Sequence, residues 1–226
     1  MKKQLFFLIL SLILSQILFS FRNCFADPTL EAVRKVNGNA GASDYCMDAV
    51  STSDGGLITA GYSSDNLTSY ATLIKYNSSG STQWLRTFRE KVNGSYSYSR
   101  IITDNADNIF VAGGILNEVT GYDILVQKYS PDGVVIWTKK INSSSNNSDA
   151  ISEFKQDHSG DLLILFNEQG DNPHINVAKL NNSGNILWQF RYTDTLSTAT
   201  SFSIDSLNNI YPAAGFIRFT VHLRCL

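Results

Sequence analysis

The sequence predicts an all-β protein, a β-propeller of about four four-stranded antiparallel blades. A Gly-x-x-x-Trp motif occurs three times, and its tryptophans, at positions 84, 137 and 188, lie 53 and 51 residues apart. Each interval contains four short segments that are rich in β-branched and aromatic residues, with turn-forming Gly, Asn and Asp between them. A repeated unit of about fifty residues has to stack against its neighbours to bury its apolar faces.

We call the four segments of each copy A, B, C and D, in chain order. Tight A–B and C–D turns, with a longer B–C connection between them, predict the up-and-down meander of a propeller blade. No segment shows a sustained apolar period of 3.6, so we expect essentially no helix after the N-terminal leader. Segment B lies at residues 57–61, 109–113, 162–166 and 210–214, and segment C at 71–76, 124–129 and 175–180.

The alignment of the copies predicts the domain organisation. Residues 30–36 align with residues 82–88, so the mature chain begins with a lone D strand. Pairing of this strand with the last copy would close a ring and hide the sheet edges. Pro212 inside the last B segment, and the loss of the pattern after residue 216, weaken that closure. A compact four-bladed ring and an open arc, as a broken piece of a longer propeller, are therefore two equal alternatives. The predicted blades are about 46–90, 98–142 and 149–193, with a partial blade at 198–226, in a domain of residues 27–226.

Residues 1–26 are predicted to be a signal peptide. Two lysines precede an apolar stretch at residues 5–21, and Ala26 provides a small residue before the cut. We therefore expect a secreted, periplasmic or cell-surface protein with no membrane segment after cleavage. An uncleaved membrane anchor, or a lipoprotein acylated at Cys24, are the alternative interpretations.

Charge and cysteine content exclude several classes of function. Lys and Arg total 18 against 20 for Asp and Glu, and no basic run occurs, so we expect no nucleic-acid partner. The three cysteines do not have the spacing of a metal site, and we expect no bound metal. In an oxidising compartment, Cys46 and Cys225 can pair only if the two ends of the mature chain meet.

The repeated glycines and tryptophans have two possible roles. We favour packing between blades, because a large ring at an equivalent place in each copy stabilises by the area it buries. An aromatic floor for a sugar or another flat ligand is the alternative. The repeated positions are Gly80, Trp84, Gly133, Trp137, Gly184 and Trp188.

Asp104, Asp157 and Asp205 occupy one repeated position just before the A–B turn, where the first copy has Thr52. Aspartate commonly caps such turns with its own side chain, and we favour this role. A calcium loop needs a fuller run of oxygen ligands than these turns contain.

A lysine also repeats inside segment C, at positions 75, 128 and 179. Its neighbours are apolar, so we expect the stem to pack while the ammonium reaches water. A ring of lysines that binds an anion is the alternative.

Residues 107–113 and 128–133, followed by Trp137, resemble the secreted bacterial β-propeller repeat proteins of the quinoprotein-like and seven-bladed types. The resemblance covers roughly residues 44–215. In quinoprotein alcohol dehydrogenases it implies eight blades, pyrroloquinoline quinone with calcium, and a catalytic aspartate. No residue here matches a cofactor position, so we expect no cofactor and no catalytic residue.

These observations predict a non-enzymatic binding or scaffold module with an unknown protein or glycan partner. The partner is expected over the axial face or at the B–C loops, residues 62–70, 114–122 and 167–173, which differ in sequence while the strands repeat. Self-association through open sheet edges is a further expectation.

The alternative is a degenerate or truncated fragment of a quinoprotein-like or glycan-processing enzyme. An enzyme of this kind predicts a cluster of carboxylates with perturbed pKa values at the axial mouth. The three histidines occupy different repeat positions, and the sequence joins none of them to a carboxylate or thiol.

Overall fold

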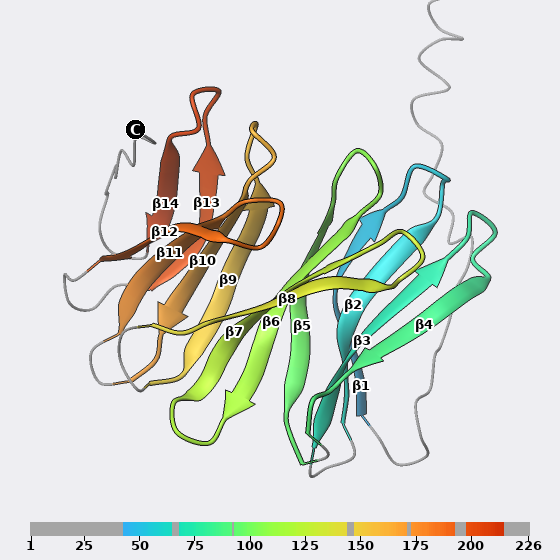
Figure 1. Cartoon of the computed structure of the whole chain (residues 1–226), viewed down its shortest axis with the longest axis horizontal. Helices are drawn as coiled ribbons and strands as arrows, with labels where there is room; N and C mark the ends of the chain where they lie inside the picture. The colour runs from blue at the N-terminus through green and yellow to red at the C-terminus, as the bar shows by residue number, and fades with distance from the viewer. Residues whose placement is uncertain are drawn as a thin grey trace, which may run out of the picture. The chain divides into compact units, whose positions relative to one another are not determined.

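A computed structural model describes residues 43–64, 68–91, 93–143, 147–170, 173–192 and 198–214 of the chain. These residues form fourteen β-strands and no helix, which confirms the all-β fold class (Figure 1). Within the same residues, no helix is long and apolar enough to cross a membrane. The predicted leader and the predicted D strand at residues 30–36 lie outside the described part of the chain.

The strands form four antiparallel sheets, three with four strands and one with two. In each complete sheet the strands pair in chain order, as an up-and-down meander requires. The first sheet contains β1 (Ser43–Ser51), β2 (Leu57–Ser64), β3 (Ser69–Tyr76) and β4 (Thr82–Phe88), and the second β5 (Tyr96–Thr103), β6 (Ile109–Asn117), β7 (Gly121–Tyr129) and β8 (Val135–Ile141). The third contains β9 (Asp149–Gln156), β10 (Leu162–Glu168), β11 (His174–Leu180) and β12 (Ile186–Tyr192), and the fourth β13 (Ala199–Ile204) and β14 (Ile210–Ala214).

None of the four sheets closes on itself, so the described strands form an open, propeller-like arrangement. Pro212 does not end the last strand, because it lies opposite Phe202 within the pairing of β13 and β14. A proline is tolerated in a strand that has a neighbour on one side only, since it has no N–H to donate on the other. Residues 215–226, the rest of the predicted partial blade, lie outside the described residues.

The sheets stack in chain order through their first strands. Strand β5 lies against β1, β2 and β3, strand β9 lies against β5, β6 and β7, and β13 lies against β9 and β10. One repeat position on these strands carries Ile101, Phe154 and Phe202, all nearly fully buried. The first copy has Ala49 there, and it is exposed.

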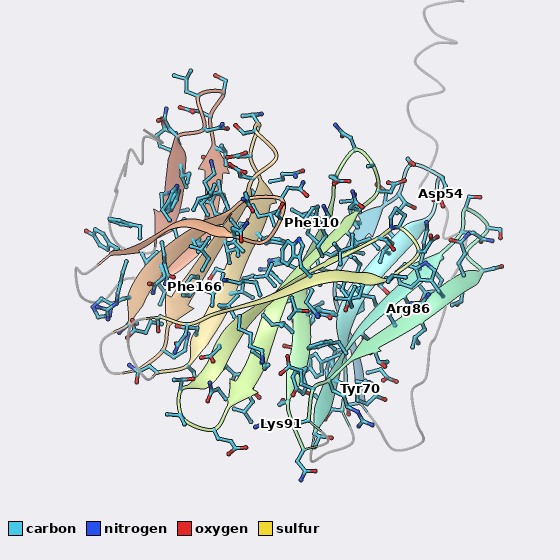
Figure 2. All side chains as sticks on the ribbon, viewed as in Figure 1. Asp54, Tyr70, Arg86, Lys91, Phe110 and Phe166 are labelled. Carbon is cyan, nitrogen blue, oxygen red and sulfur yellow. The ribbon has the colours of Figure 1, made fainter. Side chains whose placement is uncertain are left out.

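Each pair of neighbouring sheets encloses its own apolar core. Ile58 and Leu73 of the first sheet pack with Val111 and Leu125 of the second. Phe110 of the second sheet and Phe166 of the third, both labelled in Figure 2, belong to the next core. Strands β10 and β11 are buried along their whole length, because both faces of the third sheet are covered.

The repeated tryptophans lie at these junctions, half-buried, and pack on the three cores. Gly133 and Gly184, in the C–D turn of the following sheet, lie against Trp84 and Trp137. A Cβ on Gly133 would lie 3.3 Å from the Trp84 ring, and one on Gly184 would lie 2.8 Å from the Trp137 ring. The Trp137 indole N–H also donates to the Asn182 carbonyl oxygen at 3.1 Å.

The same contact is reinforced at the first junction by Arg86. Its guanidinium lies over the Trp84 ring and donates to the carbonyl oxygens of Gly133, at 3.0 Å, and Asp132, at 2.9 Å. Gly80, Gly133 and Gly184 all have a positive φ, between 74° and 82°. The Gly-x-x-x-Trp motif therefore combines a left-handed turn with a surface on which the next turn lies.

Gly184→Ala is expected to destabilise the protein more than Gly160→Ala. Both glycines have a positive φ, 82° and 84°, so an alanine at either position costs about 1–2 kcal/mol of backbone strain. At position 184 the added Cβ also meets the Trp137 ring, whereas at position 160 its nearest neighbour is the Gln156 amide at 3.7 Å. Urea denaturation measures both free energies of unfolding. If both variants lose the same free energy of unfolding, the contact between Gly184 and Trp137 does not contribute to stability as we infer.

Candidate functional site

The sheets have two ends with different chemistry. We call the end that carries the A–B and C–D turns the turn end. The other end carries the B–C hairpins and the connections from each D strand to the next A strand, and we call it the hairpin end. Because neighbouring strands alternate in direction, these two sets of connections lie at opposite ends of the strands in every sheet.

At the turn end, Asp104, Asp157 and Asp205 cap their own A–B turns. Asp104 Oδ1 accepts hydrogen bonds from the backbone N–H groups of residues 106 and 108, at 3.0 and 2.9 Å. Asp157 Oδ1 does the same for residues 159 and 161, and Asp205 Oδ1 for residues 207 and 209. The side-chain amide of Asn209, together with these N–H groups and the Tyr211 hydroxyl, lowers the pKa of Asp205 to about 2.

The first copy, with Thr52 at this position, uses Asp54 instead. Asp54 Oδ1 accepts from the Thr52 hydroxyl at 2.5 Å and from the Gly56 N–H at 2.9 Å. The carboxylates are thus engaged within their turns. Over the part of the chain that the structure describes, no group of three or more His, Cys, Asp or Glu side chains is arranged to hold a metal ion.

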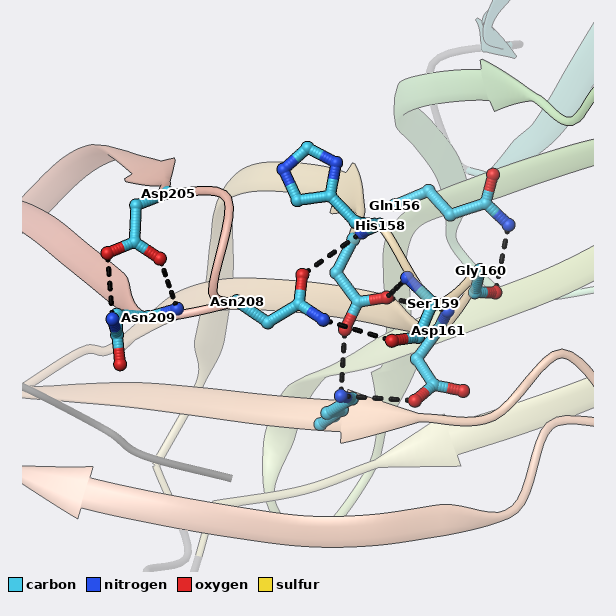
Figure 3. A network of polar contacts seen from close by, with 10 residues as sticks. Gln156, His158, Ser159, Gly160, Asp161, Asp205, Asn208 and Asn209 are labelled. Carbon is cyan, nitrogen blue, oxygen red and sulfur yellow. Dashed lines mark hydrogen bonds and ion pairs between the residues drawn. The ribbon is translucent and has the colours of Figure 1, made fainter. Parts of the chain in front are cut away.

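The A–B turns also bond to one another across sheet junctions. Asp107 and Asn208 stand at the left-handed position of their turns, with φ of 56° and 61°. Asp107 Oδ1 accepts from the Ser53 N–H at 3.2 Å, which joins the first two sheets. Asn208 accepts from the His158 N–H at 3.1 Å and donates to the Ser159 hydroxyl at 2.9 Å, which joins the third and fourth (Figure 3). Gly160 occupies the left-handed position of the third copy and has no side chain to reach the second sheet.

The repeated lysines differ from the expectation that their ammonium groups reach water. Lys179 is buried, and its ammonium lies 2.7 Å from Asp157 Oδ2 and 3.0 Å from Asp161 Oδ2. The Lys75 ammonium lies 3.0 Å from Asp54 Oδ2. Lys128 donates to the Asn182 side chain and lies over the Phe110 ring. The expectation was wrong because the partners come from turns on other segments, and ammonium groups so engaged do not form an anion-binding ring.

At the hairpin end, the third sheet carries a row of charged residues that the other sheets lack. Asp149, Glu168 and His174 are direct cross-strand partners on β9, β10 and β11. The same row reads Asp44, Ser63 and Tyr70 in the first sheet and Tyr96, Ile115 and Asp123 in the second. We call Asp149, Glu168 and His174, with Arg191 beside them, the charged row.

Arg191 links the charged row through two acceptors. Its Nε and Nη2 lie 3.0 and 2.9 Å from Glu168 Oε2, and Nη2 lies 3.1 Å from His174 Nδ1. A guanidinium only donates hydrogen bonds, so His174 Nδ1 accepts and carries no proton. His174 Nδ1 lies 3.8 Å from Glu168 Oε2, which makes this histidine a neighbour of a buried carboxylate rather than an isolated side chain.

Asp149 is the incompletely satisfied member of the charged row. Its Oδ2 accepts from the Ser143 N–H at 2.7 Å, but Oδ1 is buried without a hydrogen-bond partner among the described residues. Burial raises the pKa of Asp149 to about 6, and the nearby carboxylates of Asp123 and Glu168 raise it further against the opposing bond from Ser143. A carboxyl with this pKa is largely protonated in mildly acidic solution.

The charged row meets one requirement of the alternative hypothesis, an enzyme, and does not meet another. A carboxyl with a raised pKa beside an ion-paired carboxylate is the pattern of an acid–base pair. However, Asp149 is only 3% exposed and Glu168 only 1% exposed, so a substrate has no access to either carboxyl in this structure. The charged row therefore links the strands of the third sheet to one another and, through Asp149 and Ser143, to the segment that precedes β9.

The hairpin end also carries three tyrosines near one another, Tyr45, Tyr62 and Tyr122. Tyr45 and Tyr62 face each other across β1 and β2, with ring centroids 4.8 Å apart and planes 23° from parallel. The Tyr122 hydroxyl, from β7, donates to Ser95 Oγ at 3.1 Å. Burial, and then the neighbouring Tyr45 and Tyr122, raise the pKa of Tyr62.

The sequence led us to expect function at the B–C loops, which lie at the hairpin end, and this stays a prediction. It did not point to the side chains that come together there. Tyr62 and Tyr122 fall within the B–C loops that we expected to carry function, and Glu168 and His174 fall within or beside the third of them. The alignment of repeats hid the charged row, because its residues differ from those at the same place in the other copies. His158 lies at the turn end. Cys46 is exposed and unpaired, and Cys225 lies outside the described residues.

Comparisons with known proteins find likenesses among solved structures. No protein-family model matches the sequence, and no curated protein matches it. The chain is similar to the crystal structure, at 1.35 Å resolution, of a protein of unknown function from Bacteroides caccae, with a TM-score of 0.47 and 16% sequence identity over 78% of this chain. The chain spans 58% of the length of that protein. A likeness at this TM-score carries no argument about function.

Lys179→Met is expected to lower the free energy of unfolding by about 3–5 kcal/mol, because it leaves Asp157 as an unpaired buried carboxylate. Lys75→Met is the matched control at the same repeat position. Its partner Asp54 is 44% exposed and stays hydrated, so its loss is expected to be clearly smaller. Urea titration of both variants tests the difference, and a larger loss in Lys75→Met would contradict it.

Asp149→Asn is expected to stabilise the protein at neutral pH and not in acid. Since the folded-state pKa, about 6, is above the ordinary value of 3.8, folded protein binds this proton more tightly than the unfolded chain does. The contribution of Asp149 to stability is therefore full below about pH 4 and is lost as the pH rises to about 6.

Melting temperatures of wild type and variant across this range measure the effect. The variant is expected to melt higher at pH 7.5, with the gap closing toward about pH 4. A gap that is independent of pH would contradict the assignment. Asp205→Asn is the control, with an expected effect of opposite sign. Because the pKa of Asp205 is lowered, this variant is expected to melt at a lower temperature than wild type at neutral pH.

Proposed function

We propose that this chain is a non-enzymatic binding module that works outside the cytoplasm and holds its ligand at the hairpin end. The carrying observation is the difference between the two ends. At the turn end, the aspartates, lysines and glycines of successive copies bond within the chain. At the hairpin end, Tyr45 and Tyr122 are exposed, and each occurs in one copy only. Residues that depart from a repeat without serving its packing are candidates for recognition.

The alternative of a degenerate or truncated quinoprotein-like enzyme is less well supported. Catalysis needs carboxyls within reach of a substrate, whereas Asp149 and Glu168 are covered. A distant relationship to quinoprotein-like propellers is compatible with stacked four-stranded sheets and is kept as part of the proposal. The extracytoplasmic location depends on the predicted signal peptide at residues 1–26. Self-association through open sheet edges is retained as a secondary proposal.

Oriented attachment of the full chain tests where a ligand binds. A single biotin is placed at position 118, on the β6–β7 hairpin, or at position 132, in a C–D turn; Glu118 and Asp132 are both exposed. Each form coats a streptavidin surface at equal density and is exposed to soluble xylan, mannan, glycogen, alginate and gelatin. We expect at least one polymer to bind the form attached at position 132, and to bind the form attached at position 118 about tenfold less.

Three results would overturn the proposal: no polymer binding in either orientation, binding that is lost when position 132 is attached, or progressive cleavage of the bound polymer. Cleavage is followed by the release of reducing ends from the polysaccharides and of peptides from gelatin. The last result would return the enzyme alternative to first place.

A further inference from the structure

Two of the three tyrosines at the hairpin end are exposed, and Tyr62 is half-buried. Tyr45 is 50% exposed and Tyr122 is 39% exposed, so much of each ring remains in water. Leu116 and Val119, on the hairpin that carries Tyr122, are exposed as well. Contiguous exposed apolar and aromatic surface in a protein of this size commonly marks a binding site.

The repeat gives no structural reason for these rings. In the register of the sheets, Tyr62 corresponds to Gly114 and Asn167, and Tyr45 corresponds to Ser97 and Ala150. Since two further sheets pack well with small or polar residues at these places, the aromatic rings are not needed for the fold.

The side chains that bond to Tyr122, and to its partner Ser95, are uncharged and carry hydroxyl groups. Tyr122 OH and Ser69 Oγ both bond to Ser95 Oγ, at 3.1 and 2.7 Å, and Ser148 Oγ accepts from the Tyr122 N–H at 3.1 Å. Arg100, the cation of strand β5, donates to the carbonyl oxygens of Ser99 and Ser152, at 2.8 and 2.6 Å. The site therefore offers flat apolar rings beside neutral hydrogen-bonding groups.

We propose that Tyr45, Tyr62 and Tyr122 form a binding site for a neutral saccharide. The C–H face of a pyranose ring stacks on the exposed face of a phenol ring, and the sugar hydroxyls bond to neighbouring hydroxyl groups. Among the described residues no cation lies over any of these three rings, and the chain as a whole has a net charge of −2, which does not favour a phosphate-bearing or otherwise anionic ligand. The inference rests on the proposed function and names the ligand class of its hairpin end.

Affinity electrophoresis of the full chain tests the assignment, with gels that contain xylan, mannan or glycogen as neutral polysaccharides and alginate as the anionic one. Tyr45→Ala and Tyr122→Ala are each expected to weaken retardation by a neutral polysaccharide about tenfold. Tyr122→Phe keeps the ring and is expected to retain most of the binding. Leu187→Ala removes an equally exposed apolar side chain, 50% exposed on β12, and is expected to change nothing.

Thermal melting of each variant shows that it is folded, and Tyr45→Leu, which removes the aromatic ring but keeps an apolar side chain, replaces Tyr45→Ala if that variant does not fold. The inference is overturned if no neutral polysaccharide retards the wild type, if Leu187→Ala weakens binding as much as Tyr45→Ala does, or if alginate alone binds. If gelatin binds at the hairpin end and no neutral polysaccharide does, the saccharide assignment is overturned, but the proposal of a binding module is not. Failure of every polymer at that end would overturn both.

Discussion

The rest of this structure follows from one constraint, that both apolar faces of a sheet have to be covered. A four-stranded sheet in this chain is apolar on both faces, so each inner sheet needs a neighbour on either side. The first strand of each following sheet supplies that contact, through residues such as Ile101, Phe154 and Phe202. Polar groups enter the cores with their partners. Gln127, for example, donates to Thr138 at 2.7 Å and accepts from the hydroxyls of Tyr98 and Tyr129.

The two ends of the sheets differ in how far their residues repeat from copy to copy. At the turn end, a short set of residue types recurs because every copy has the same turn to cap and the same neighbour to contact. At the hairpin end, the B–C connections vary between three and five residues and their sequences differ, whereas every A–B and C–D turn has five residues. The expectation of longer B–C connections was therefore wrong, because these strands continue almost to the hairpin. The charged row shows that this variation in sequence has a cost, since a buried carboxyl with an unpartnered oxygen opposes folding at neutral pH.

The repeat pattern was enough to predict the strands, their order and the turns. Glycine at 80, 133 and 184 marks turns because the left-handed backbone there suits no other residue as well. What the pattern could not predict are contacts between different segments. Lys179 meets Asp157 only because strand β11 lies beside the A–B turn. Asp149, Glu168 and His174 come from three strands, and only the pairing register places them in one row.

The alternation of side chains at the left-handed position of the A–B turns has a mechanical consequence. Asp107 ties the second sheet to the first and Asn208 ties the fourth to the third, while Gly160 leaves the middle of the array without an equivalent tether. The junction between the second and third sheets is held at the turn end by Trp137 and Lys128, which both donate to Asn182 of the following C–D turn. Its resistance to separation therefore depends on the C–D turn and not on a contact between A–B turns.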